Sequence, residues 1–318
     1  MIVSILFMGT PEFAVPCFHM LLEEGYDVVG AVTQPDRPKG RGGKLAVPPV
    51  KEAALAAGVR VLQPERPGDA YDEFAALGAD LIVTAAYGGI LRKRLLALPR
   101  KGTVNVHASL LPRYRGPSPI HMALLNGDRE TGVTTMLTDA GIDTGAVLLS
   151  EAMPIPEGMY FQELHDRLAV LGAEVLKKTL PLWLGGGIRP RPQDDAAATR
   201  APILTKDAGN LDFSLGAERL ANTVRAFSLW PGAAVTLCGK RLKVHRAHVG
   251  CGGPPSLAAS AAAAPANVPG MVAAVTRDAL SVLCGDHRTL EITELQFENG
   301  KKMKIAECWH NLQWMKSG

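Results

Sequence analysis

Apolar residues follow two different periods in the first half of the chain. Continuous apolar runs at residues 2–8, 28–32 and 81–85 predict strands that are buried on both faces, and residues 59–62 are predicted to form another, short strand. Between these runs, apolar residues recur at helical spacing over 13–24, 50–57, 71–77 and 91–98. Strands that alternate with helices form right-handed β-α-β units. We therefore predict an α/β fold with a doubly wound, mostly parallel, Rossmann-like sheet.

The pattern changes to strict alternation at residues 103–107. Val104 and Val106 are apolar, whereas Asn105 and His107 are polar, so both polar side chains are predicted on one face of a strand. A loop punctuated by proline and glycine follows at 109–116, and then a helix at 118–125. Further strands at 132–137 and 146–152 enclose a glycine-containing turn that carries Asp143. A long amphipathic helix over 161–184 is predicted to cover the sheet.

Three glycines at 185–187, followed by a stretch rich in proline and alanine, indicate a domain boundary. We predict a first domain at residues 1–184, a linker at 185–205 and a smaller second domain at 206–318. The second domain has a predicted helix at 217–226 and short strands at 233–237, 241–247, 270–275, 281–284 and 289–295. Short strands at such regular spacing are typical of a small, OB-like β-barrel. An alanine-rich segment at 256–265 is typical of a variable loop.

Charge is unevenly distributed between the two predicted domains. The chain has 318 residues and a formal net charge of +3, and 47% of its residues are hydrophobic, which suits a soluble protein with two domains. Residues 206–318 contain 13 Lys and Arg against 9 Asp and Glu, whereas residues 1–205 contain 21 against 22. The positive excess of the second domain fits a surface that contacts phosphates. An ordinary solvated face is the alternative.

Several classes of site are disfavoured by the sequence. Five cysteines without a Cys-x-x-Cys pair favour free thiols in a reducing compartment, and we expect a cytoplasmic protein. His245, His248 and Cys251 are three residues apart, but no matching ligand pair lies nearby, so no metal site is expected. The first apolar run is followed by Gly-Thr-Pro and not by Gly-x-Gly-x-x-Gly, which argues against an NAD site and a signal peptide. No run is long enough to span a membrane.

Asn105, His107 and Asp143 together suit attack of an amine on a carbonyl carbon. The amide can donate to the carbonyl oxygen, and the imidazole can donate to the same oxygen or shuttle a proton. The carboxylate can keep the imidazole charged, or accept a proton from the nucleophile through water. From spacing alone, the alternative is that Asn105 and His107 are satisfied polar residues at a strand end and Asp143 is a turn residue.

The chain resembles the folate-dependent formyltransferases in several motifs. The resemblance extends over residues 1–318 and is strongest in the first 150. It is carried by Asn105-Val106-His107-Ala108-Ser109-Leu110-Leu111-Pro112, Arg115-Gly116, Thr131-Gly132-Val133-Thr134 and Asp143-Thr144-Gly145, with further matches at Phe7 to Ala14, Thr33 to Pro38 and Ala86-Tyr87-Gly88.

This resemblance implies an enzyme that transfers the formyl group of 10-formyltetrahydrofolate to the α-amine of methionine carried on initiator tRNA. In that reaction Asn105 and His107 would stabilise the formyl oxygen. Asp143 would pair with His107 and help to remove the proton of the amine, through water. The residues implied in framing the folate are Ser109, Leu110, Leu111, Pro112, Tyr87 and Gly88. The loop at 86–91 would line the pterin pocket largely through backbone groups.

Residues 35–49 differ in kind from the rest of the first domain. Arg37, Lys39, Arg41 and Lys44 place four positive charges within eight residues, with no acidic residue among them. Three glycines and flanking prolines predict that this segment contains no regular element. Such composition is usually that of a solvated surface loop. The resemblance favours a basic finger that grips the phosphates of the tRNA acceptor stem.

Other functions remain open at the level of sequence. The same trio would serve formyl transfer to a small amine, such as an amino-sugar nucleotide, or hydrolysis of formyl-folate by water. A non-catalytic RNA-binding protein is a third possibility, against which the intact trio argues. The basic segment discriminates between these readings, because a small amine has no use for it. We expect a monomer that binds folate and tRNA, without a metal.

Overall fold

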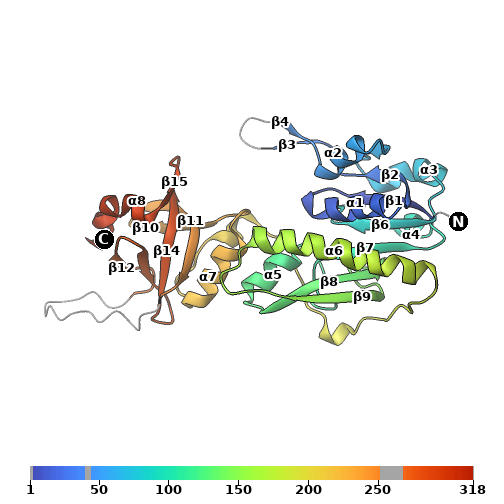
Figure 1. Cartoon of the computed structure of the whole chain (residues 1–318). Helices are drawn as coiled ribbons and strands as arrows, with labels where there is room; N and C mark the ends of the chain where they lie inside the picture. Colours follow the sequence, from blue (N-terminus) through green and yellow to red (C-terminus); the bar gives the residue numbers. More distant parts are fainter. Residues whose placement is uncertain (1–2, 40–43, 251–267, 318) are drawn as a thin grey trace. The chain divides into compact units, whose positions relative to one another are not determined.

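The computed structural model describes residues 3–39, 44–250 and 268–317. The chain divides into two compact units, which are described separately (Figure 1). The first comprises residues 1–119, 130–154 and 164–202, and the second comprises residues 120–129, 155–163 and 203–318. In the described parts of the chain, no helix is both long enough and apolar enough to cross a membrane.

The first unit is built on a seven-stranded sheet in the order β5-β2-β1-β6-β7-β8-β9. Its strands are β1 (Ser4–Gly9), β2 (Asp27–Val32), β5 (Val61–Leu62), β6 (Leu81–Ala85), β7 (Thr103–His107), β8 (Glu130–Leu137) and β9 (Val147–Pro154). The pairings from β5 to β7 are parallel, whereas those of β7 with β8 and of β8 with β9 are antiparallel. The predicted mostly parallel sheet is confirmed, and β7 lies where the strand direction changes.

Helices cover both faces of this sheet. They are α1 (Val15–Glu23), α2 (Pro49–Ala56), α3 (Tyr71–Ala76), α4 (Lys93–Leu96) and the long α6 (Phe161–Leu184). Leu6 of β1 packs with Phe74 of α3 and Leu95 of α4 on one face. On the other face, the ring of Phe7 lies 5.5 Å from that of Phe18 in α1. This alternation of neighbouring residues is the doubly wound arrangement that the apolar runs predict.

Helix α6 lies over β7 and β8, the strands on which the candidate site depends. Gly172 of α6 permits a close approach, because a Cβ at this position would lie 3.1 Å from Cγ1 of Val106 in β7. Two turns further along, the hydroxyls of Thr179 and of Thr135 in β8 are 2.8 Å apart. These contacts hold the strand that bears Asn105 and His107 against a 24-residue helix.

The segment predicted as a linker follows the surface of the first unit as far as residue 202. Gly186, with φ of +73°, lies where α6 ends. Val147 and Arg191 then exchange two backbone hydrogen bonds of 2.8 Å, and the N–H of Arg115 donates to the carbonyl of Thr199 at 2.9 Å. The segment has no apolar period, yet its backbone groups pair with loops of the sheet. We call residues 188–201 the strap.

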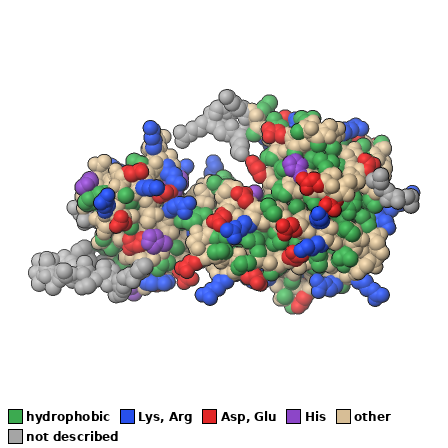
Figure 2. Space-filling model, viewed as in Figure 1, with side chains coloured by type: hydrophobic (Ala, Val, Ile, Leu, Met, Phe, Trp, Pro, Cys, Tyr) green, Lys and Arg blue, Asp and Glu red, His purple; other side chains and the backbone are tan. Residues whose placement is uncertain are grey.

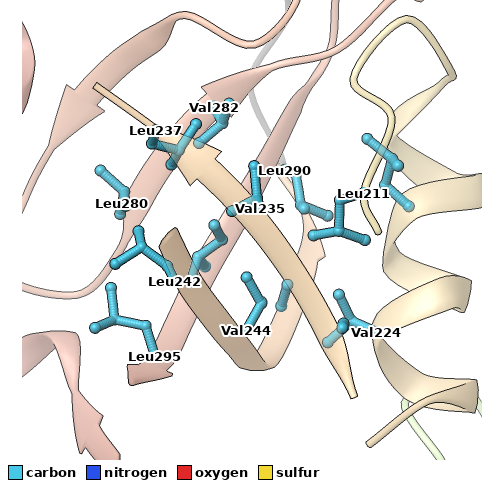
Figure 3. Packing of buried hydrophobic residues seen from close by; sticks show 14 of the residues in the cluster. Leu211, Val224, Val235, Leu237, Leu242, Val244, Leu280, Val282, Leu290 and Leu295 are labelled. Carbon is cyan, nitrogen blue, oxygen red and sulfur yellow. The ribbon is translucent and has the colours of Figure 1, made fainter. Parts of the chain in front are cut away.

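The second unit contains a six-stranded antiparallel sheet in the order β10-β11-β14-β13-β12, with β15 paired to β14. Its strands are β10 (Ala233–Leu237), β11 (Lys240–Val249), β12 (Val272–Val275), β13 (Leu280–Leu283), β14 (Thr289–Phe297) and β15 (Lys302–Lys304). Helix α7 (Ala217–Ala226) packs against β11 and β14. Figure 3 shows their common apolar core, which includes Leu242, Val244 and Leu290. The prediction of a second, smaller β-domain is confirmed, and its sheet is antiparallel.

Some elements differ from the predicted ones. Helix α5 (Pro119–Leu125) has nearly its predicted bounds, whereas α4 covers only half of the predicted 91–98. The pattern predicts neither β15, nor α8 (Ile305–Cys308), nor the 3-10 helix Trp309–Ser317. The alanine-rich segment 256–265 lies outside the described residues. Figure 2 shows Lys and Arg side chains interspersed with Asp and Glu on the visible face of the first unit.

Candidate active site

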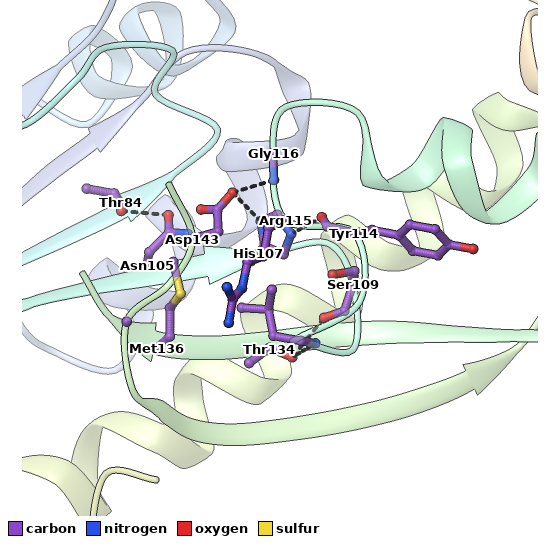
Figure 4. A network of polar contacts seen from close by, with 12 residues as sticks. Thr84, Asn105, His107, Ser109, Tyr114, Arg115, Gly116, Thr134, Met136 and Asp143 are labelled. Atoms are coloured by element: carbon purple, nitrogen blue, oxygen red, sulfur yellow. Dashed lines mark hydrogen bonds and ion pairs between the residues drawn. The ribbon is translucent and has the colours of Figure 1, made fainter. Parts of the chain in front are cut away.

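Asn105 and His107 lie on one face of β7, near the end of the strand (Figure 4). Asn105 is paired with Thr84 of the parallel strand β6, and His107 is paired with Thr134 of the antiparallel strand β8. Asn105 is half-buried, whereas only 6% of His107 is exposed. The alternation predicted from the sequence therefore places the two polar groups together as expected.

A threonine hydroxyl orients the amide of Asn105. Thr84 Oγ1 donates to Asn105 Oδ1 at 2.7 Å. Because this bond uses the oxygen of the amide, both N–H groups on Nδ2 remain for other acceptors. The donor atom Nδ2 of Asn105 is thus not the atom that faces Thr84, and it can serve as the predicted hydrogen-bond donor. Sequence reasoning missed Thr84, although it is the one polar residue in the run Leu81–Ala85.

A backbone carbonyl fixes the proton of His107. Nε2 of His107 lies 2.9 Å from the carbonyl oxygen of Tyr114. A carbonyl oxygen can only accept, so Nε2 carries a proton and Nδ1 is the ring atom left for chemistry. Tyr114 has φ of +61°, an uncommon backbone conformation for a residue with a side chain. The loop after β7 therefore adopts an unusual conformation at the residue that receives this hydrogen bond.

Asp143 reaches the site from the turn between β8 and β9. The turn starts beside the beginning of β7, where the N–H of Thr138 donates to the carbonyl of Thr103 at 2.8 Å. Asp143 lies beside His107, at the other end of β7. Asp139 Oδ1 accepts from the N–H of Gly141 at 2.9 Å. A Cβ on Gly145 would lie 1.6 Å from the carbonyl oxygen of Leu137. Only glycine permits this close approach, as the glycine content of the turn indicates.

The trio predicted from the sequence is assembled. Asp143 Oδ2 lies 3.7 Å from Nδ1 of His107, and it accepts a hydrogen bond of 2.8 Å from the N–H of Gly116. The side chains of His107 and Asp143 are 7% and 19% exposed. The carboxylate faces Nδ1 of the imidazole, and the N–H of Gly116 holds the carboxylate in place. The site thus joins an amide donor, an imidazole nitrogen and a carboxylate on one face.

The loop predicted to frame the folate is fastened beside the trio. Thr134 Oγ1 donates to the carbonyl of Ser109 at 2.7 Å and accepts from the N–H of Leu111 at 3.1 Å. Ser109 is fully buried, and its hydroxyl donates to the carbonyl of Arg113 at 2.6 Å. Leu110 and Pro112 are half-buried and Leu111 is buried. The hydroxyl of Ser109 is thus engaged within the loop. A folate role for Ser109, Leu110, Leu111 and Pro112 stays a prediction.

Tyr87 and Gly88 follow β6 at the same edge of the sheet. The Tyr87 side chain belongs to the apolar cluster on the face of α3 and α4, and its hydroxyl has no hydrogen-bond partner among the described residues. Burial raises the pKa of Tyr87 to about 12. The carbonyl of Tyr87 accepts from Thr10 Oγ1 at 2.9 Å. A folate role for Tyr87 and Gly88, largely through backbone groups as the resemblance implies, stays a prediction.

The expectation that residues 35–49 contain no regular element is wrong. Strands β3 (Arg37–Lys39) and β4 (Lys44–Ala46) pair in an antiparallel ribbon. All three glycines of the segment lie between the two strands in the sequence, where they do not interrupt pairing. Arg37 forms an exposed ion pair of 3.1 Å with Glu65. Arg41, and the side chains of Lys39 and Lys44, lie outside the described part of the structure.

A polar cluster at the start of this ribbon was not predicted. Lys51 Nζ lies 2.7 Å from Asp36 Oδ2 and 2.7 Å from Gln63 Oε1. Gln63 Nε2 donates to Asp36 Oδ1 at 2.8 Å. The hydrogen bond from Lys51, with that from Gln63, lowers the pKa of Asp36. The residue before β3 is thereby attached to α2 and to the segment after β5.

The described residues contain no cluster of three or more His, Cys, Asp or Glu that could hold a metal. His245 Nε2 is instead 3.1 Å from Gln296 Oε1. Cys251 lies outside the described residues. Cys17, Cys238, Cys284 and Cys308 are free thiols.

Comparison with known protein families identifies the family of the chain. Residues 1–180 match the model of the formyl transferase family, and residues 203–313 match that of the formyl transferase C-terminal domain. The chain belongs to the formyl transferase family. The resemblance found in the motifs is therefore confirmed, and Asn105, His107 and Asp143 all lie within the matched N-terminal region.

This formyl transferase is similar over nearly its whole length to curated proteins named methionyl-tRNA formyltransferase. The protein from Ruminiclostridium cellulolyticum is 44% identical over 306 residues, which are 96% of this chain and 95% of that protein. The protein from Caldanaerobacter subterraneus is 47% identical over 317 residues, which are 97% of each chain.

Solved structures with lower identity share the fold. The N-formyltransferase from Helicobacter canadensis, solved with folinic acid and dTDP-3-aminofucose, has a TM-score of 0.67 at 15% identity and covers 92% of this formyl transferase and 99% of that chain. HypX from Aquifex aeolicus, solved with tetrahydrofolic acid, has a TM-score of 0.61 at 17% identity and covers 99% of this chain and 47% of that one.

Proposed function

We propose that this chain transfers a formyl group from 10-formyltetrahydrofolate to the α-amine of methionine carried on initiator tRNA. The observation that carries the proposal is an assembled Asn105, His107 and Asp143 trio in a chain that is 44–47% identical, over nearly its full length, to methionyl-tRNA formyltransferases. The product would be N-formylmethionyl-tRNA, which serves translation initiation.

The geometry supports a direct attack without a covalent enzyme intermediate. The amine nitrogen attacks the formyl carbon, and the electron pair of the carbonyl bond moves to the formyl oxygen. Nδ2 of Asn105 and a protonated Nδ1 of His107 donate to this oxygen. Each donor stabilises the transition state by about 3 to 4 kcal/mol. Asp143 stabilises the charged imidazole. It also accepts the proton of the attacking nitrogen through water, and N10 of the folate gains a proton as its bond to the formyl carbon breaks.

Binding roles follow from the position and charge of three regions. Leu110 to Pro112 and the backbone at Tyr87 and Gly88 frame the folate beside the trio. Arg37, Lys39, Arg41 and Lys44 meet phosphates of the tRNA acceptor stem. The second unit, with its excess of Lys and Arg, contributes further phosphate contacts. The first unit is the catalytic domain and the second is the tRNA-binding domain.

A formyl transfer assay with competing acceptors tests the proposal. Purified full-length protein and 10-formyltetrahydrofolate are mixed with methionyl initiator tRNA, free methionine, an amino-sugar nucleotide or no acceptor. We expect product only with the charged tRNA, and loss of folate formyl without acceptor to be slow. Transfer to the amino-sugar nucleotide at a comparable rate would replace the tRNA with a small amine. Rapid loss without any acceptor would make the protein a hydrolase.

A further inference from the structure

The strap contributes one side chain that contacts both loops of the candidate site. Nε2 of Gln193 donates to the carbonyl oxygens of Asp143 and Gly145, at 2.8 and 2.7 Å. Oε1 of Gln193 accepts from Nε of Arg115 at 2.9 Å. The two N–H donors and the oxygen of this amide are therefore all engaged. A single side chain thus joins the Asp143 turn to the loop that follows His107.

These contacts act on the two peptides that set the position of the Asp143 carboxylate. One is the backbone of Asp143 itself, which has φ of +54°. Residues other than glycine rarely adopt this conformation. The other is the peptide that joins Arg115 to Gly116. The N–H of Gly116 donates to Asp143 Oδ2 at 2.8 Å. Arg115 is kept in place because its N–H donates to the Thr199 carbonyl at 2.9 Å.

The carboxylate faces the imidazole without a direct hydrogen bond to it. Its Oδ2 is 3.7 Å from Nδ1 of His107, which is beyond a direct hydrogen bond. A small rotation of the turn would therefore change how strongly Asp143 acts on the ring, because charge interactions depend on distance where solvent is partly excluded. We propose that Gln193 is a positioning residue, whose amide ties the Asp143 turn to Arg115 and thereby directs the Asp143 carboxylate toward His107. This inference rests on the proposed function.

Gln193→Met tests it, because methionine keeps the length of the side chain and removes its hydrogen bonds. We expect kcat to fall about tenfold, the equivalent of a modest loss of alignment, while the KM values for tRNA and folate stay within about twofold. Gln313→Met is the matched control. Gln313 Nε2 also donates to a backbone carbonyl, that of Trp309 at 3.2 Å, but in the second unit. Its kcat should equal that of the wild type.

A double-mutant cycle separates positioning from general stability. Gln193→Met is combined with Asp143→Ala, and turnover is measured with enzyme in excess over substrate. If Gln193 acts through Asp143, its replacement should cost less than about twofold in the Asp143→Ala background. A full tenfold loss in that background would overturn the proposal, and so would an unchanged kcat in the folded single variant.

Gln193→Glu keeps the test decisive if the methionine variant does not fold. Glutamate still offers an oxygen to Arg115, but its second oxygen faces the two turn carbonyls, which also only accept. We expect Gln193→Glu to lower kcat at least as much as Gln193→Met does, and this loss should again be absent in the Asp143→Ala background. A wild-type kcat in the Gln193→Glu variant would overturn the proposal. The cycle is run with whichever acceptor the wild type uses, so an inactive charged tRNA would refute the proposed function and leave the Gln193 test intact.

Discussion

The trio and the β3–β4 ribbon belong to the same unit but are held in opposite ways. His107 and Asp143 are 7% and 19% exposed, and each is fixed by a backbone group from the loop after β7. In the ribbon, Arg37 is 64% exposed and meets a Glu65 that is 72% exposed. An ion pair between two side chains as exposed to solvent as these contributes little to the stability of the fold.

The difference corresponds to two kinds of work. Stabilising a developing oxyanion requires dipoles that are oriented before the reaction, so hydrogen bonds that hold the side chains are useful. Phosphate binding gains free energy chiefly from released counterions and tolerates side chains that become ordered only on contact. On this reasoning, small changes at the trio should be costly in kcat, whereas the ribbon should respond to charge and salt.

The largest effect is expected at the trio. Asn105→Ala, His107→Ala and Asp143→Ala should each lower kcat about a hundredfold or more, because each removes a group that acts in the transition state. Thermal unfolding midpoints and folate affinity serve as controls. Two replacements combined should cost less than the product of the single effects. Near-normal kcat in any one variant would remove that residue from the mechanism.

The ribbon should respond in affinity and not in kcat. Replacing Arg37, Lys39, Arg41 and Lys44 with alanine should flatten the slope of log affinity against log salt by roughly 3 to 4 units, if each meets one phosphate. The measurement is tRNA binding over a fixed range of salt, and folate affinity should be unchanged. An unaltered slope would mean that the ribbon is an ordinary solvated surface excursion.

A matched pair of threonines sharpens the contrast within the sheet. Thr84→Val removes the hydroxyl that orients Asn105 and should lower kcat about tenfold, the value of one lost hydrogen bond near 1.4 kcal/mol. Thr103 is also buried, but its hydroxyl has no partner among the described residues. Thr103→Val should leave kcat unchanged and stability equal or higher. Equal effects of both changes would argue that Thr84 does not orient the amide.

The smallest effect is expected at Tyr87. Tyr87→Phe should change the free energy of unfolding at pH 7 by less than about 0.5 kcal/mol, because the buried hydroxyl has no partner to lose. It should leave folate affinity unchanged. Burial raises the pKa of Tyr87 to about 12, above the ordinary value near 10. Its contribution to stability is therefore present below about pH 10 and is lost as the pH rises toward 12. The phenylalanine variant should lose less stability over that interval, in denaturant titrations.

The sequence predicted well where side-chain period and chain direction agree. Strands β6 and β7 and helices α6 and α7 have their predicted bounds. Asn105 and His107 were found because alternation and residue type pointed to the same face. Glycine predicted the turn of Asp143, which cannot accept a Cβ at Gly145.

Groups that act through tertiary contacts could not be predicted in the same way. The carbonyl of Tyr114 leaves no trace in residue type, and Gln193 lies in a segment without apolar period. The proline and glycine content of residues 35–49 conceals the β3–β4 ribbon, because the three glycines lie between the two strands in the sequence. Thr84 offered a signal in retrospect, as a lone hydroxyl in an apolar strand.

The position of the strap in the chain has a consequence for synthesis. Chains emerge from the ribosome with the amino terminus first, and domains generally fold as units. A nascent chain that ends at residue 184 contains the whole trio but not Gln193, whereas one that ends at residue 202 contains both. The catalytic unit is therefore complete only after about eighteen further residues have been added beyond its last long helix, at which point residues 203–318 of the second unit have still to be made.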